Sequence, residues 1–241
     1  MNRRHFMKLC ATAGAAIAAR PSVLGASQAP LRPSRPARLV DPAGNPLRPD
    51  DLIEGENYVF HYPYVATPCF LIDLGKPVAG EEELTTEDGR RYRWHGGTGP
   101  RRSVVAFSAI CAHRMSYPTR KVSFIKYHHS PPAETSTGWT SRTRDHVIHC
   151  CSEGSVYDPA AGARVLAGPA KQPLAAIDLS FDEGEGFTAA GTYGGDMFDR
   201  FFAEFEFQLR LQHGTESVRE PVGDATVVWP LAEYSANERI C

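Results

Sequence analysis

The sequence predicts an all-β protein with antiparallel sheets and a C-terminal helix. The 241 residues include 21 glycines and 19 prolines, which indicates many turns and therefore a β-rich body. Apolar segments are short and lie between turn residues, as is typical of strands. Near the C-terminus, by contrast, apolar residues fall at helical spacing.

The expected strands follow one another through the middle of the chain. They lie within residues 57–75, 104–110, 121–127, 146–149, 156–166, 174–181 and 187–192. Phe201, Phe202, Phe205 and Leu209 then predict a helix over residues 198–211. An irregular tail is expected after residue 213.

The order of these segments divides the chain into four parts. Residues 1–29 resemble a twin-arginine signal peptide, because Arg3 and Arg4 precede a weakly apolar run. Residues 30–54 are rich in proline and arginine and predict a linker or extended arm. Residues 55–195 form the β domain, and residues 196–241 form a helical extension with its tail.

The signal peptide implies export to the periplasm by a route that carries folded proteins. No stretch of 18 apolar residues is present, so no transmembrane anchor is expected. The formal net charge of −2 gives no reason to expect nucleic acid as a partner.

Two cysteine-led motifs each follow a predicted strand. Cys111-Ala112-His113 comes directly after the strand at 104–110. The second motif, His149-Cys150-Cys151-Ser152-Glu153-Gly154-Ser155-Val156-Tyr157-Asp158, follows the strand at 146–149. Two loops at strand ends can face each other, and thiolate and imidazole are ligands for iron. We therefore expect a metal site between these loops.

The pair of motifs resembles the Rieske iron–sulfur domain, which holds a [2Fe–2S] cluster between a C-x-H loop and a C-x-x-H loop. Gly154-Ser155 and Tyr157-Asp158 match the family's flanks, and Gly168-Pro169-Ala170 is similar to its proline loop. The resemblance is firm over residues 100–180. It implies a Rieske-type β-sandwich with a small cluster-binding subdomain at about residues 104–174.

The resemblance also implies roles for individual residues. Cys111, His113 and Cys150 would be ligands, Ser155 and Tyr157 would donate hydrogen bonds to sulfur atoms, and Pro169 would lie in the loop that covers the cluster. Such hydrogen bonds raise the reduction potential of a cluster.

One ligand position departs from the family pattern, because Glu153 stands where the second histidine belongs. Three interpretations follow. Glu153 binds iron through its carboxylate, or Cys151 supplies a third thiolate, or the fold is kept as a scaffold without a cluster. The first makes Cys111, His113, Cys150 and Glu153 the metal ligands.

The functional expectation is periplasmic one-electron transfer through a Rieske-like [2Fe–2S] cluster. The protein would act as the small subunit or partner of a larger oxidoreductase, or of a periplasmic redox protein, rather than as a catalyst alone. The alternative is a cluster-free interaction module with the same fold. A ring-hydroxylating oxygenase is rejected, since the residues after the β domain are few and contain one histidine, His213.

A group of basic residues lies close to the ligand loops in the sequence. It predicts either a docking face for an acidic redox partner or an ordinary solvated face. Its members are Arg101, Arg102, Arg114, Arg120, Lys121, Arg142 and Arg144.

Overall fold

The computed structural model describes residues 31–129 and 145–239. The predicted signal peptide with Cys10, the basic residues Arg142 and Arg144, and Cys241 lie outside this part of the chain. Within it, the predicted β-rich architecture with a C-terminal helix is confirmed.

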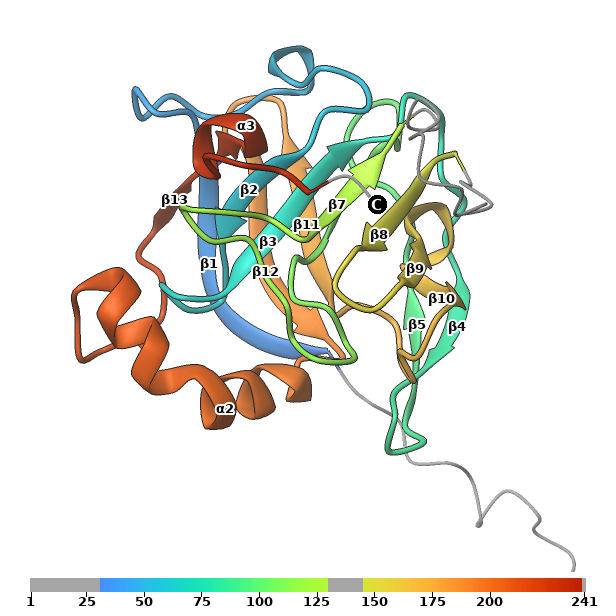
Figure 1. The fold of residues 1–241 in the computed structure, drawn as a ribbon. Coiled ribbons are helices and arrows are strands. Elements are labelled where there is room, and N and C mark those ends of the chain that lie inside the picture. The colour runs from blue at the N-terminus through green and yellow to red at the C-terminus, as the bar shows by residue number, and fades with distance from the viewer. Residues whose placement is uncertain (1–30, 130–144, 240–241) are drawn as a thin grey trace, which may run out of the picture.

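The strands form three sheets (Figure 1). In chain order they are β1 (Arg32–Val40), β2 (Tyr58–His61), β3 (Pro68–Asp73), β4 (Glu82–Thr85), β5 (Arg91–Trp94), β6 (Val104–Ser108), β7 (Ile125–His128), β8 (Val147–Cys150), β9 (Ser155–Asp158), β10 (Arg164–Ala167), β11 (Ala176–Asp182), β12 (Gly186–Tyr193), β13 (Ala225–Val227) and β14 (Trp229–Pro230). Helix α2 (Asp196–His213) and the short α3 (Leu231–Tyr234) complete the fold, together with 3-10 turns at Pro49–Asp51 and Pro159–Ala161.

A large sheet and a small sheet carry most of the molecule. The large sheet has the strand order β13-β1-β12-β11-β6-β3-β2-β14, and the small sheet has the order β10-β9-β8-β7. Strands β4 and β5 form a separate hairpin. In the view of Figure 1 the small sheet lies to the right of the large sheet, and α2 lies below on the opposite side.

The central strands of the large sheet are buried on both faces. Every residue of β3 and β6 is buried, as their continuous apolar sequences predict. Because side chains alternate along a strand, Phe70 and Phe107 belong to one core while Leu71 and Ala106 belong to another. The first core also contains Cys111, Cys150 and Tyr157, so the candidate site is built on this face.

The large sheet curls until its two ends meet. Strand β13 pairs in parallel with β1 at one end of the strand order, whereas the other pairings are antiparallel. The Thr226 hydroxyl of β13 donates a hydrogen bond of 3.0 Å to the carbonyl oxygen of His61 on β2. This contact joins strands from opposite ends of the sheet and makes it nearly a closed barrel.

Helix α2 follows β12, as predicted, and extends two residues further at each end than the predicted helix over residues 198–211. Phe198, Phe201, Phe202 and Leu209 are buried on one face. Gly214, with φ of +62°, terminates the helix in the left-handed conformation that glycine tolerates. Among the described residues, no helix has the length and apolar character that a membrane span needs.

Three segments differ from the sequence prediction. Residues 32–40, expected in a linker or arm, form β1 within the large sheet. Residues 82–85, which lie outside the predicted strands, form β4, which pairs with β5. The tail, expected to be irregular, contains β13, β14 and α3.

Candidate metal centre

The first candidate loop begins where β6 ends. The backbone N–H of Ile110 donates to the Ser108 hydroxyl, and the chain then turns tightly. The Cys111 N–H donates to the Ser116 carbonyl, and the Met115 N–H donates back to the Cys111 carbonyl, both at 2.9 Å. This closed turn buries Cys111 and leaves His113 at the tip, with its side chain 26% exposed.

The second candidate loop is the tip of the β8–β9 hairpin. Cys150 and Ser155 are directly opposite each other in the antiparallel ladder, and both are fully buried. The Gly154 N–H donates to the Cys150 carbonyl at 2.8 Å, and Gly154 adopts a φ of +75°. The hairpin therefore places Cys150, Glu153 and Ser155 around one short turn.

The two loops bring Cys111 and Cys150 into hydrogen-bonding contact. Neither cysteine forms a disulfide. The Cys150 thiol donates to Cys111 and, with smaller help from the Tyr157 hydroxyl, holds the pKa of Cys111 below its usual value. The pKa of Cys150 is raised, because its proton is held in this hydrogen bond and the thiol is buried. The pair therefore favours a thiolate on Cys111, and thiolate is the metal-binding form of cysteine.

Tyr157 reaches the same sulfur from β9. Its hydroxyl oxygen accepts a hydrogen bond of 3.1 Å from the Ala112 N–H, which leaves its proton directed at Cys111, 3.2 Å away. Burial, followed by the nearby Cys111, raises the pKa of Tyr157, so the phenol stays protonated as a donor. The structure thus places Tyr157 where the sequence resemblance expects a donor to a ligand sulfur.

His113 and Glu153 form a second pair beside the cysteines. The Nδ1 atom of His113 lies 3.1 Å from Oε2 of Glu153, and Nε of Arg114 lies 3.1 Å from Oε1 of the same carboxylate. The His113–Glu153 contact is close, yet it lacks the direction of a hydrogen bond, so the buried Nδ1 has no satisfied partner among the described residues. One carboxylate therefore faces both an imidazole and a guanidinium.

Ser155 supplies a further unsatisfied group. Its hydroxyl oxygen is buried and makes no geometrically acceptable hydrogen bond within the described residues, although it faces Cys111 closely enough to contribute slightly to lowering the pKa of that thiol. A buried hydroxyl and a buried imidazole nitrogen that both lack partners are costly in a folded protein. Both atoms are members of the predicted ligand or donor set.

The predicted ligand side chains divide into two pairs, as the ligands of a two-iron cluster would. No group of three or more histidine, cysteine or acidic side chains in the described part of the chain is arranged to hold one metal ion. The predicted ligands instead come in two pairs, Cys111 with Cys150 and His113 with Glu153. A Rieske centre needs this division, because its two irons take different ligand pairs.

Cys151, the alternative third thiolate, is placed differently. Its N–H donates to the Phe124 carbonyl at 2.7 Å, and its sulfur is part of a disulfide. A disulfide sulfur is not a thiolate ligand, so Cys151 in this state is not a third thiolate, and Glu153 as fourth donor stays a prediction.

The predicted proline loop packs against the second ligand loop. Gly168 has a φ of +87°, and a Cβ atom on it would lie 2.4 Å from the Gly154 carbonyl oxygen. Only glycine allows such close contact between the two backbones. Pro169 itself is exposed, and its role in covering the cluster stays a prediction.

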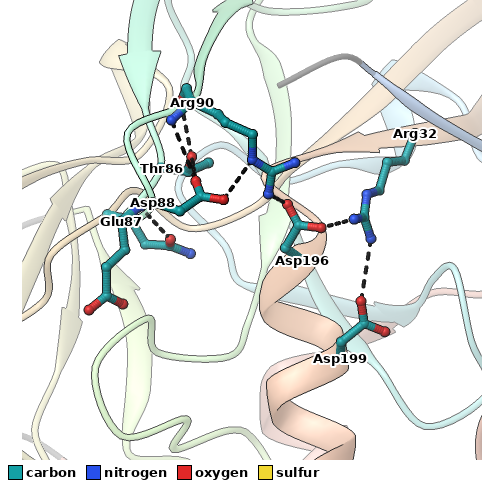
Figure 2. Close-up of polar contacts among 8 residues, drawn as sticks. Arg32, Thr86, Glu87, Asp88, Arg90, Asp196 and Asp199 are labelled. Atoms are coloured by element: carbon teal, nitrogen blue, oxygen red, sulfur yellow. Dashed lines mark hydrogen bonds and ion pairs between the residues drawn. The ribbon is translucent and has the colours of Figure 1, made fainter. Parts of the chain in front are cut away.

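The proline loop is tied to the rest of the molecule through Gln172. The Gln172 side-chain oxygen accepts a hydrogen bond of 2.9 Å from the Glu87 N–H in the β4–β5 turn. Figure 2 shows the ionic network beside this turn, in which Arg90 pairs with Asp88 and Asp196. Arg32 of β1 pairs with both Asp196 and Asp199 at the start of α2.

Sequence reasoning did not find the contact between Arg114 and Glu153, nor that between Gly168 and Gly154. Arg114 was visible as a neighbour of His113, but only the folded loops show which carboxylate it faces. Gly168-Pro169 was expected in the loop that covers the cluster, but the sequence did not indicate that Gly168 would lie against Gly154.

No protein-family model matches the sequence. Among solved structures, the chain is similar to the crystal structure of the soluble domain of Rieske protein II (soxF) from Sulfolobus acidocaldarius. The identity is 24%, the match covers 63% of this chain and 80% of that chain, and the TM-score is 0.37. The assignment of the site rests on the contacts described above.

Proposed function

We propose that this protein carries single electrons through a Rieske-type [2Fe–2S] cluster. Cys111 and Cys150 would hold one iron, and His113 and Glu153 would hold the other. The observation that supports this most is the meeting of two buried thiols with a buried tyrosine hydroxyl beside a histidine–carboxylate pair. When bound, such a cluster takes up and releases one electron at a time.

The surrounding residues would tune this site. Tyr157 donates a hydrogen bond to the Cys111 sulfur, which stabilises negative charge and favours the reduced state. Ser155 would supply a second donor from the opposite side of the hairpin. The positive charge of Arg114 lies next to Glu153. It offsets part of the negative charge that a carboxylate brings in place of an imidazole.

The exposed tip suggests how electrons would leave. His113 is the partly exposed member of the predicted ligand set, whereas both cysteines are buried. A partner subunit or redox protein would therefore approach over the first loop, next to Arg114. This supports a role as the small subunit or partner of a larger oxidoreductase.

The proposed location is the periplasm, reached by the twin-arginine route. Arg3 and Arg4 carry this inference from the sequence. Replacing both by lysine keeps the charge and should abolish export. Fractionation of cells that produce the full chain would show the protein in the cytoplasm, whereas unchanged export would contradict the proposal.

A cluster-free module remains the second candidate because the site residues also satisfy one another. Cys150 donates to Cys111, and Glu153 faces both His113 and Arg114. In this case the loops would be an ordinary structural feature, and the protein would act through its surface.

Metal analysis of the full chain separates the two functions. We expect about two iron and two acid-labile sulfide per chain after production with ample iron, with the electron paramagnetic resonance signal of a reduced [2Fe–2S] centre. Cys150→Ser should lose both. Cys69→Ser is the matched control, because Cys69 is also buried and free but belongs to the other core and donates to the Tyr62 carbonyl. A folded, colourless wild-type protein would establish the cluster-free alternative.

A further inference from the structure

A cavity with both polar and apolar walls is lined by residues other than the cysteine pair. Its volume is about 460 Å³, which lies within the size range of small-molecule sites. Five parts of the chain enclose it: the end of β2, residues 66–68 at the start of β3, residues 117–121, the end of α2, and α3. Its polar lining comes mainly from His61, Tyr117, Arg120, Lys121, His213 and Tyr234.

The cavity collects positive charge without a counter-ion. Arg120 and Lys121 line it, no carboxylate does, and neither cation forms an ion pair with another described residue. The Arg120 guanidinium lies 4.5 Å from the centre of the Tyr234 ring, so its charge is held over the cavity wall. A cationic concave surface attracts anions.

Two histidines line the cavity beside these cations. The rings of His61 and His213 are 5.6 Å apart, and Nε2 of His61 is 3.0 Å from the Tyr234 hydroxyl. Burial, then His213 and Arg120, lower the pKa of His61 to about 3, and burial followed by Arg120 lowers the pKa of His213. Both imidazoles are therefore neutral at pH 7, held so by burial and by positive charge that nothing in the cavity offsets.

The cavity walls are held in place by hydrogen bonds. The Ser235 hydroxyl donates to the Thr119 carbonyl at 2.6 Å, and the Ala236 N–H donates to the Arg120 carbonyl at 3.0 Å. On the other wall, the Tyr117 hydroxyl donates to the Gln212 side chain at 2.9 Å. A site that is already ordered loses less entropy when a ligand binds.

The shape and the lining limit the class of ligand. One inorganic ion would fill little of the volume, and the rings of Tyr117 and Tyr234 together with Ala66 and Pro68 give the cavity an apolar part. His213 at the end of α2 is neutral at pH 7, so Arg120 and Lys121 carry the positive charge of the cavity, and no carboxylate among the described lining residues pairs with them.

We propose that this cavity binds a small organic anion. Its carboxylate would pair with Arg120 and Lys121, and its apolar part would lie against the rings of Tyr117 and Tyr234. The proposal is independent of the cluster, because none of these residues belongs to the predicted ligand loops' donor set.

Binding of benzoate to the purified full chain tests the proposal, with succinate as a second carboxylate. Isothermal titration should show saturable binding of at least one of them. Neutral benzamide should bind at least about 10-fold more weakly than benzoate. Arg120→Gln should weaken carboxylate binding about 10- to 100-fold, whereas Arg120→Lys should keep most of it. Arg219→Gln is the matched control, since Arg219 also stacks on a ring, that of Phe202, outside the cavity.

The pH dependence gives a second readout. A bound anion favours imidazolium, so carboxylate affinity should increase from about pH 7 to about pH 5. The charged and titratable groups facing His61 are His213 from α2, Arg120 and Lys121 from the loop, Tyr117, and Tyr234 from α3. In unliganded Arg120→Gln, nuclear magnetic resonance should show a higher pKa for His61 than in the wild type, which also reports that the variant is folded.

Three results would overturn the proposal. These are no saturable binding of either carboxylate up to about 10 mM, equal binding of benzamide and benzoate, or an equal loss in Arg120→Gln and Arg219→Gln.

Discussion

The protein places histidine next to arginine in two regions that differ in one respect. At the loop tips, Glu153 lies 3.1 Å from both His113 and Arg114. In the cavity, His61 and His213 lie beside Arg120, and no carboxylate is present among the lining residues. The residue types are the same, yet the first region is electrostatically balanced and the second is not.

The difference shows that the presence or absence of a carboxylate, more than the histidine and arginine themselves, determines what each region can bind. A balanced cluster can hold a cationic group or serve only the fold, whereas an unbalanced one attracts an anion. Changes that add or remove charge in one region, while leaving the other unchanged, are therefore the sharpest tests.

Removing the carboxylate at the tips should have the largest effect. If Glu153 binds iron, Glu153→His should raise the reduction potential by an amount on the order of 100 mV, because one unit charge near the cluster is worth about 4 kcal/mol at an effective dielectric constant of 20. Redox titration measures this. Carboxylate binding in the cavity should stay the same. No shift in potential would show that Glu153 is not a ligand.

Gly168→Ala should damage the tips and spare the cavity. The added Cβ meets the Gly154 carbonyl oxygen at 2.4 Å and also forces alanine into a left-handed backbone conformation. We expect a loss of about 3 kcal/mol in the free energy of unfolding, measured by denaturant titration. Gly44→Ala is the control, since Gly44 has a similar φ of +89° but nothing within 4 Å of an added Cβ. Equal losses in both variants would show that the proline loop does not press on the second ligand loop.

Acid should destabilise the protein through the cavity histidine. His61 has a pKa of about 3 in the folded protein and near 6.5 when unfolded, so the unfolded state binds more protons between these values. Its contribution to stability is therefore present above pH 6.5 and is lost as the pH falls toward 3. Between about pH 7 and pH 5 the loss is about 2 kcal/mol. Unfolding curves of His61→Gln should be less pH-dependent than those of the wild type by this amount, whereas an unchanged pH dependence would contradict it.

Tyr157→Phe should give the smallest shift. It removes a donor to the Cys111 sulfur without changing the size of the ring. The loss of one hydrogen bond of about 1 kcal/mol corresponds to a potential lower by about 40 mV. Redox titration of the cluster-loaded variant checks this, with Tyr127→Phe as control because the Tyr127 hydroxyl contacts His146 instead. An equal change in the reduction potential of both variants would show that Tyr157 has no specific role in setting it.

Much of the fold was visible in the sequence because its central strands are buried on both faces. The continuous apolar runs at β3 and β6 are such strands. Strand β1 was missed because it contains Pro33 and Pro36, which usually interrupt strands; here the pairing with β12 is irregular between Pro33 and Ala37. In β5 the alternation of Arg91, Tyr92, Arg93 and Trp94 was a usable signal that the surrounding polar residues hid.

The candidate site was predictable residue by residue but not as an arrangement. Local motifs identified Cys111, Cys150 and Tyr157, and the structure brings them together. The distances among His113, Arg114 and Glu153 depend on how two separate loops approach each other, and no local pattern encodes that. The cavity was hidden for the same reason, since residues 61, 120, 213 and 234 lie far apart in the sequence.

The pairing of β13 with β1 affects how the protein must be made. Leu39 faces Thr226 across this pair, so the large sheet cannot be completed until nearly all of the described chain has left the ribosome. Contacts between residues so distant in sequence slow folding, because the intervening chain must be ordered first. We expect nascent chains halted before residue 225 to remain sensitive to proteases.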